Sequence, residues 1–243
     1  MPYFETRLKV NIRNFDEIEK KLDFCKKLGI RNLILEPVNT FKQISIELRE
    51  KIIHQAKLNI YFRYNLTPNS INDFKNAIKN YNNFPYILSV ESKDKQIQIN
   101  AARDSRVDIV SFSDENILKT LSKGVISLTK QNNSFIEFSL APIMVSNKAL
   151  QSKNFRFLYK FIQLAYKSKA NIIISGNFDE IFDLRHPRSL LSICHSLLDI
   201  PLNSAKKIFM DNPKLLIEKV QNRKDNNNIK SGIRLIKGGE LKW

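Results

Sequence analysis

The stretch that decides the fold is "YFETRLKVNIRNFDEIEKKLDFCKKLGIRNLILE", residues 3–36. From Phe4 to Val10, uncharged and charged side chains alternate, which is the two-residue period of a β-strand. A helix is predicted over residues 14–29, because Asn14 and Glu17 have the spacing of a capping box and Gly29 is a stop signal. The apolar run "NLILE" then predicts a second strand. Strand, helix and strand in this order predict one unit of an α/β sheet.

The same alternation of strand and helix signals continues along the chain. Further strands are predicted at residues 59–66, 85–91, 106–112, 135–142 and 171–175. Further helices are predicted at residues 45–57, 70–81, 95–104 and 114–130, with a long one marked by Phe155, Leu158, Ile162 and Ala165. Seven such units predict an α/β fold whose parallel sheet is covered by helices. At 243 residues, this favours a TIM-barrel-like (β/α) barrel over an open doubly wound sheet.

The C-terminal part breaks the alternation. The stretch "DLRHPRSLLSICHSLLDIPLNSAKKIFMDNP", residues 183–213, predicts three short helices in succession. An eighth strand is not visible, so the barrel is either incomplete or closed by these helices. Residues 231–239 fit a late strand or an extended tail. We therefore expect one barrel domain over residues 1–223, followed by a basic tail over residues 224–243.

The charge of the chain points to a phosphate-rich partner. Forty Lys and Arg residues against 24 Asp and Glu residues give a net charge of +16, with a pI of about 9.8. A generally basic proteome would produce the same excess of positive charge. As a partner, nucleic acid explains this excess better than a membrane surface does. Cys25 and Cys194 lie in apolar helical stretches, which predicts free thiols and a reducing cytoplasm. No apolar run approaches the roughly 20 residues of a membrane span.

Isolated charges interrupt several predicted strands, namely Glu36, Arg63, Glu91 and Glu137. A barrel strand is covered on both faces, so these charges should meet in or above the lumen. Paired ions that fill the barrel interior explain them. The alternative explanation is a polar floor beneath a binding surface.

The sequence predicts neither a metal site nor catalytic residues. Its three histidines, His54, His186 and His195, are scattered, and none forms a metal-ligand pair at a strand end. A serine or cysteine nucleophile with a neighbouring base is not recognisable either.

Basic residues are the candidate functional residues. Arg185 and Arg188 stand where a helix begins near Pro187, and Lys206 and Lys207 are expected to start the next one. Free amides and the helix dipole favour phosphate at such positions. The remaining candidates are Arg103 and Arg106 beside the fifth strand, and Lys42 and Arg63 near the carboxyl ends of the second and third units. Each alone fits a solvated surface charge, but as a set they predict contacts to an RNA backbone on the functional face of the barrel.

The segment "ANIIISGNFDEIFDLRHPRSLLSICHSLLDIPLNSAKKIFMDNPKLLIEKVQNR", residues 170–223, resembles the archaeal ribonuclease P protein component 3 family. The shared order is an apolar strand that ends in Ser, then Leu-Arg-x-Pro, a Leu-rich helix, Ala-Lys, and Asn-Pro opening the last helix. The runs "RVDIVSF" and "FIEFSL" are similar to the fifth and sixth strands of that family.

The resemblance implies a barrel-type subunit of the ribonucleoprotein that removes the 5′ leader from precursor tRNA. In that family the RNA is the catalyst, Mg²⁺ belongs with the RNA, and the protein pairs with protein component 2. Its fold is related to the metal-hydrolase barrels of the polymerase-and-histidinol-phosphatase type, without their complete metal site. The motif places Arg185, Pro187 and Lys206 on matching positions, with Arg185 and Lys206 as expected contacts to ribonuclease P RNA. Ser189 departs from the pattern, because the family often has an acidic residue there.

Two other functions fit the same residues. One is a metal-dependent phosphoesterase on such a barrel, which the polar strand charges suggest. The other is a general RNA-binding barrel with no part in tRNA processing.

Overall fold

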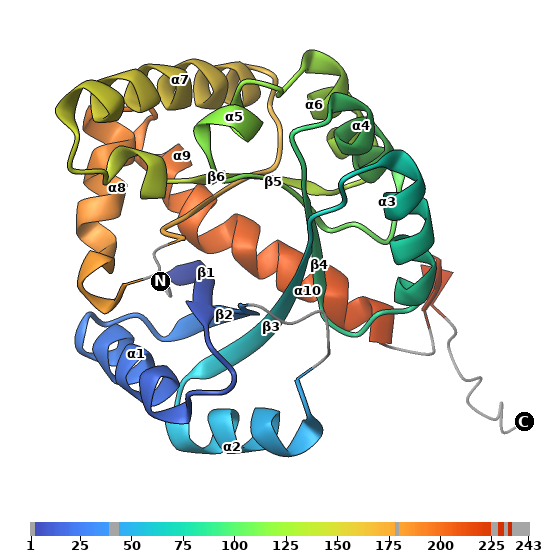
Figure 1. The fold of residues 1–243 in the computed structure, drawn as a ribbon, viewed down its shortest axis with the longest axis vertical. Helices are drawn as coiled ribbons and strands as arrows, with labels where there is room; N and C mark the ends of the chain where they lie inside the picture. Colours follow the sequence, from blue (N-terminus) through green and yellow to red (C-terminus); the bar gives the residue numbers. More distant parts are fainter. Residues whose placement is uncertain (1–2, 39–43, 178–179, 225–227, 231–232, 235–243) are drawn as a thin grey trace, which may run out of the picture.

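The computed structural model describes residues 3–38, 44–177, 180–224, 228–230 and 233–234. Seven parallel strands within these residues form a nearly closed barrel, and the strands follow one another around it in sequence order (Figure 1). The strands are β1 (Phe4–Val10), β2 (Asn32–Pro37), β3 (Asn59–Leu66), β4 (Ile87–Glu91), β5 (Ile109–Phe112), β6 (Phe135–Ser139) and β7 (Ile172–Ser175). The predicted TIM-barrel-like α/β fold is confirmed.

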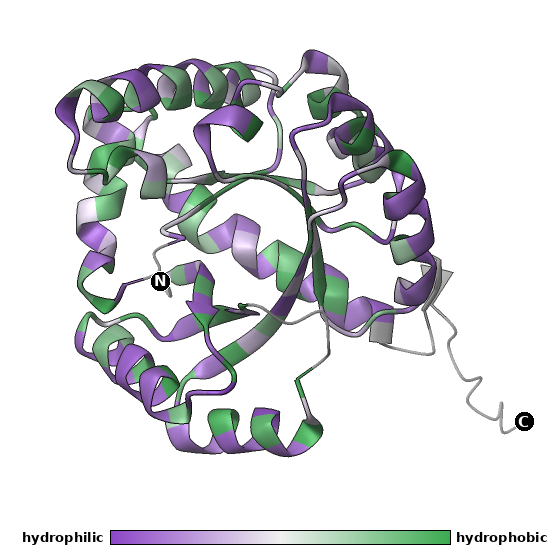
Figure 2. Ribbon diagram, in the orientation of Figure 1, coloured by the Kyte–Doolittle hydropathy of each residue, from purple (hydrophilic) through white to green (hydrophobic). Residues whose placement is uncertain are grey.

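Helices cover the outside of the barrel in the predicted order. They are α1 (Phe15–Lys27), α2 (Ile46–Ala56), α3 (Ile71–Ile78) with the 3₁₀ turn η1 (Lys79–Tyr81), α4 (Lys95–Arg103), α5 (Glu115–Leu118), α6 (Lys123–Gln131), the 3₁₀ turn η2 (Ala141–Ile143) and α7 (Lys148–Lys167). Asn14 Oδ1 accepts from the Glu17 amide at 3.2 Å, as the capping spacing predicts. Figure 2 shows polar and apolar residues mixed along these helices, which is the pattern of elements with one buried and one exposed face.

Two predicted elements end earlier than expected. The helix predicted over residues 114–130 is divided into α5 and α6, because Ser122 caps a new helix by accepting from the Val125 amide at 3.3 Å. The strand predicted over residues 135–142 ends at Ser139. Pro142 has no amide hydrogen for a sheet, and the chain turns there into η2.

The chain after β7 is mainly helical. After β7 come the 3₁₀ turn η3 (Ile181–Asp183) and α8 (Pro187–Ser196). A continuous helical run follows, made of α9 (Leu202–Lys206), the π-helix η4 (Lys207–Asp211) and α10 (Asn212–Lys224). The residues at 228–230 and 233–234 pair as a separate antiparallel hairpin, and the rest of the 231–239 segment lies outside the described residues. The predicted division at residue 223 stays a prediction.

Helix α10 closes the amino end of the barrel (Figure 1). Apolar side chains from near the start of several strands point inward there and pack against α10; the cluster is Ile34, Ile87, Ile109, Phe135, Ile173, Leu216 and Val220. The buried carboxylate of Asp108 holds the same helix, through Lys219 Nζ at 3.3 Å and through Arg223. The lumen near the amino end is therefore packed mainly with apolar side chains, which α10 covers.

Two neighbouring leucines of α10 test this arrangement. We expect Leu216→Ala to lower the free energy of unfolding by about 3 kcal/mol, because Leu216 is fully buried and its truncation leaves a cavity. Leu215→Ala should change it by less than about 0.5 kcal/mol, because Leu215 is 54% exposed. Urea unfolding of both variants measures the difference, and equal effects would mean that α10 does not seal the barrel.

Candidate functional site

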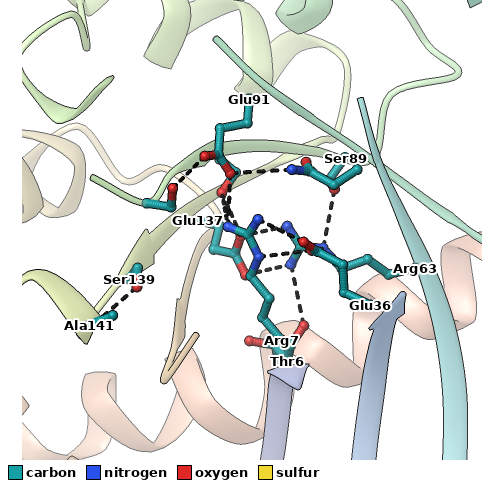
Figure 3. A network of polar contacts seen from close by, with 12 residues as sticks. Thr6, Arg7, Glu36, Arg63, Ser89, Glu91, Glu137, Ser139 and Ala141 are labelled. Atoms are coloured by element: carbon teal, nitrogen blue, oxygen red, sulfur yellow. Dashed lines mark hydrogen bonds and ion pairs between the residues drawn. The ribbon is translucent and has the colours of Figure 1, made fainter. Parts of the chain in front are cut away.

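Two buried arginines occupy the centre of the upper barrel (Figure 3). Arg63, on β3, is 0% exposed and makes a two-pronged contact with Glu137 of β6, with nitrogen–oxygen distances of 2.6 and 2.7 Å. Its Nε also lies 2.9 Å from a carboxylate oxygen of Glu36 and donates to Ser89 Oγ at 3.2 Å. The guanidinium thus links β2, β3, β4 and β6 across the lumen.

Arg7, on β1, completes the network. Its Nε and Nη2 contact the two carboxylate oxygens of Glu36 at 2.8 and 2.9 Å. Its Nη1 lies 2.9 Å from Glu91 and donates to Ser111 Oγ at 3.1 Å. Arg7, Arg63, Glu36, Glu91 and Glu137 are called the central ion network below.

The ionisation of the network follows from this pairing. Burial by itself would raise the pKa of Glu137, but the Arg63 charge, its hydrogen bonds and Arg7 together hold that pKa below its ordinary value. Burial likewise opposes the charge of Arg7, yet Glu36 and Glu91 raise its pKa above the ordinary value for arginine. Both shifts favour the charged forms of Arg7 and Glu137.

The three carboxylates of the central ion network are already engaged by guanidinium groups. Each of the three carboxylates is ion-paired to a guanidinium, so none is left as a general base or a ligand facing the lumen. Within the described ranges, no group of three or more His, Cys, Asp or Glu side chains is arranged to hold a metal ion. Of the two interpretations of the strand charges, the structure supports paired ions that fill the barrel interior.

A further carboxylate, Glu5, lies where β1 approaches β7. Its Oε1 accepts from the Gly176 amide at 3.0 Å and from the Arg7 amide at 3.2 Å. Burial raises the pKa of Glu5 to about 7, although these two amides and Arg63 act in the opposite direction. Glu5 therefore changes its charge near neutral pH, unlike Glu137, whose pKa is lowered.

The prediction that Arg63 contacts RNA is wrong. Its guanidinium is completely enclosed and committed to Glu137, Glu36, Ser89 and the Thr6 carbonyl oxygen. The sequence predicts the strand around position 63. Whether the Arg63 side chain points into the barrel depends on the strand register. Lys42 lies outside the described residues.

The residues around the start of α8 follow the prediction in part. Arg188 is exposed, and its amide donates to His186 Nδ1 at 3.1 Å, so the first turn is capped by the histidine side chain. Arg185 is half-buried, and its Nη1 donates to the carbonyl oxygen of Leu184 at 3.2 Å. Arg188 is therefore the freer of the two cations.

The remaining candidates are not on that face of the barrel. Lys206 and Lys207 are exposed, but they end α9 and begin η4 inside a continuous helical run instead of starting a helix. Arg103 and Arg106 precede β5 and so lie at the amino end of the strands, whereas α8 follows the carboxyl end of β7. The expectation that all candidates share one functional face is wrong.

Arg7 is one of the alternating charges of the first strand, but its central position in the network was not predicted. Its signal was present, because it alternates with apolar positions in the same way as the other strand charges. Which charges pair across a barrel is decided by register between distant strands, and a single sequence does not contain that register.

Arg63 provides a direct test of the central ion network. Arg63→Met should lower the free energy of unfolding by about 3 to 5 kcal/mol, because it leaves Glu137 buried without its main partner. The double variant Arg63→Met/Glu137→Leu should recover most of the loss, since both charges are then absent. Chemical unfolding at pH 7 measures both. A loss below about 1 kcal/mol in the single variant would contradict a structural role.

Glu5 predicts a pH dependence of stability. The folded protein retains the Glu5 proton up to a pKa of about 7, whereas the unfolded chain releases it near 4.5. The free energy of unfolding therefore falls as pH rises between these values, by about 2 to 3 kcal/mol from pH 5 to pH 8. Glu5→Gln should remove this part of the fall in the free energy of unfolding. Glu47→Gln is the matched control, because Glu47 is exposed. Identical pH profiles for wild type and Glu5→Gln would refute the assignment.

None of the described helices combines the length and apolar character that a membrane crossing requires.

Comparisons with known proteins agree on one family. A cryo-electron microscopy structure of archaeal ribonuclease P with mature tRNA contains a chain that matches with a TM-score of 0.79 and 18% identity, covering 96% of this chain and 98% of that one; at this identity the likeness concerns the fold.

Relatives in sequence agree. This chain is 24% identical to ribonuclease P protein component 3 of Methanococcus maripaludis over 189 aligned residues. The alignment covers 77% of this chain and 81% of that protein. The family model described as RNase P subunit p30 matches residues 6–225, which is nearly the whole barrel and its closing helices. The chain therefore belongs to the RNase P subunit p30 family, whose members are protein subunits of the tRNA-processing endoribonuclease.

Proposed function

We propose that this ribonuclease P subunit binds the RNA of its particle through exposed basic side chains and takes no part in the chemical step. The observation that carries the proposal is the central ion network. Its two guanidinium groups occupy the upper barrel, where enzymes with this fold place their reacting groups. The positive charge that remains lies on the surface, where it can neutralise phosphates.

The exposed cations supply contacts of the kind that position a protein on RNA. Arg188 lies at the start of α8, and Lys206 and Lys207 lie where α9 passes into η4. Salt bridges to carboxylates are absent for these three within the described residues, so their charges are available to phosphate oxygens. Contacts of this type fix orientation and carry no sequence information.

The partners follow from the family and stay proposals. They are ribonuclease P RNA as the direct ligand, precursor tRNA indirectly, and protein component 2 as a protein neighbour. Mg²⁺ belongs with the RNA in this scheme, and the particle works in the cytoplasm.

The salt dependence of RNA binding tests this proposal. We expect the logarithm of the binding constant for ribonuclease P RNA to fall linearly with the logarithm of salt concentration, with a slope of about −0.7 to −0.9 per phosphate contacted. Arg188→Gln/Lys206→Gln should make this slope shallower and slow cleavage of precursor tRNA by the reconstituted particle. Lys20→Gln/Lys26→Gln is the control, because it removes two exposed charges from a different helix, α1.

Three outcomes separate the candidate functions. Binding that does not change with salt would refute the proposal. Equal affinity for ribonuclease P RNA and an unrelated RNA of the same length would favour a general RNA-binding barrel. Cleavage of phosphodiesters by the isolated chain with added divalent metal would favour a phosphoesterase.

A further inference from the structure

A polar groove lies between α3 and α4 on the outer surface of the barrel. Lys75 and Lys79 line it from the α3 side, and Arg103 and Arg106 line it from the end of α4 and the following loop. Three amide side chains, Asn72, Asn76 and Asn100, complete its polar lining. The groove lies on the opposite side of the barrel from α8 (Figure 1), so it is separate from the Arg188 region described above.

Three of the four cations in the groove are free of carboxylates. The one acidic residue of the lining, Asp104, is held by Arg106, with nitrogen–oxygen distances of 2.6 and 2.8 Å. Across the described residues, Lys75, Lys79 and Arg103 form no salt bridge. Lys79 donates only a long hydrogen bond of 3.4 Å to Asn76 Oδ1. The lining therefore keeps a net positive charge that is not compensated within the protein.

The lining also excludes two other kinds of ligand. Its apolar members, Phe74 and Ile78, are each only 3% exposed, so they offer little surface to an apolar protein segment. For the same reason Phe74 provides no ring face for an unpaired base, which single-strand binding sites use. Cations and amides without an aromatic platform suit phosphates and ribose hydroxyls, the groups that a double-helical RNA presents.

We propose that the α3–α4 groove binds the sugar-phosphate backbone of a double-helical segment of RNA. Arg103, Lys75 and Lys79 contact phosphate oxygens, and the asparagine amides contact ribose hydroxyls. Arg106 stays bound to Asp104 and shapes the groove wall. This inference rests on the proposed function, because it assigns one RNA contact to a particular surface.

The test uses the full chain with three probes, namely ribonuclease P RNA, a short RNA duplex and a single strand of the same length. Lys79→Gln/Arg103→Gln removes two groove cations that make no structural ion pair, so the fold should be retained, as circular dichroism and thermal unfolding can verify. Lys20→Gln/Lys26→Gln removes the same charge from α1 and is the matched control. Dissociation constants are measured over a series of salt concentrations.

We expect wild type and the α1 control to bind the duplex more tightly than the single strand. The groove variant should lose this preference, and its salt slope should be shallower by about 0.7 to 0.9 for each phosphate that it no longer neutralises. If the groove variant and the α1 control bind every probe equally, the groove proposal is overturned while the proposed function stands. A greater loss of affinity for the single strand than for the duplex also overturns it. If wild type binds none of the probes, the proposed function itself fails.

Discussion

The contact between Arg63 and Glu137 is the constraint on which the barrel depends. Both side chains are completely buried, and a buried charge without its partner would cost several kcal/mol. The pair joins β3 to β6 across the lumen, and the contacts of Arg7 with Glu36 and Glu91 extend it to β1, β2 and β4. Strands that are not neighbours in the sheet are thus held at a fixed separation by two guanidinium groups. Below this layer, apolar side chains from the strands pack against α10, which closes the amino end of the barrel.

The alternation of strands and helices was predictable because each strand and each cap is a local signal. Asn14, Ser70 and Asp114 cap helices where the sequence places them. The division of the helix at Ser122 was missed, although Ser122 and Gly124 interrupt the apolar pattern at that point. The position of Arg103 and Arg106 was predictable in principle. Residues that precede a parallel strand lie at its amino end, and this topological rule excludes them from the face that carries the start of α8.

The central ion network could be predicted as a class of feature but not as a set of contacts. The strand charges at positions 36, 63, 91 and 137 identify a polar interior, while their pairing depends on register over separations such as that between Arg63 and Glu137. The function was harder to predict than the fold or the network. Its strongest sequence signal is net charge, and net charge does not distinguish Arg63, which is enclosed, from Arg188, which is exposed. Burial is the property that separates them, and only the fold supplies it.

A barrel of seven strands has to protect the two edge strands that an eighth unit would otherwise join, because unpaired backbone groups at a buried edge are costly. In this chain, side chains and a helix protect the edge strands, in place of the hydrogen bonds that an eighth strand would make. Glu5 accepts the Gly176 amide just beyond β7, and the same carboxylate accepts the Arg7 amide within β1. The π-helix η4 packs against both β1 and β7, where Phe209 stacks on Tyr3 with ring centroids 5.3 Å apart. Because η4 continues directly into α10, the residues that cover the edge strands also bring α10 under the barrel, so the same helical run covers the edges and closes the amino end.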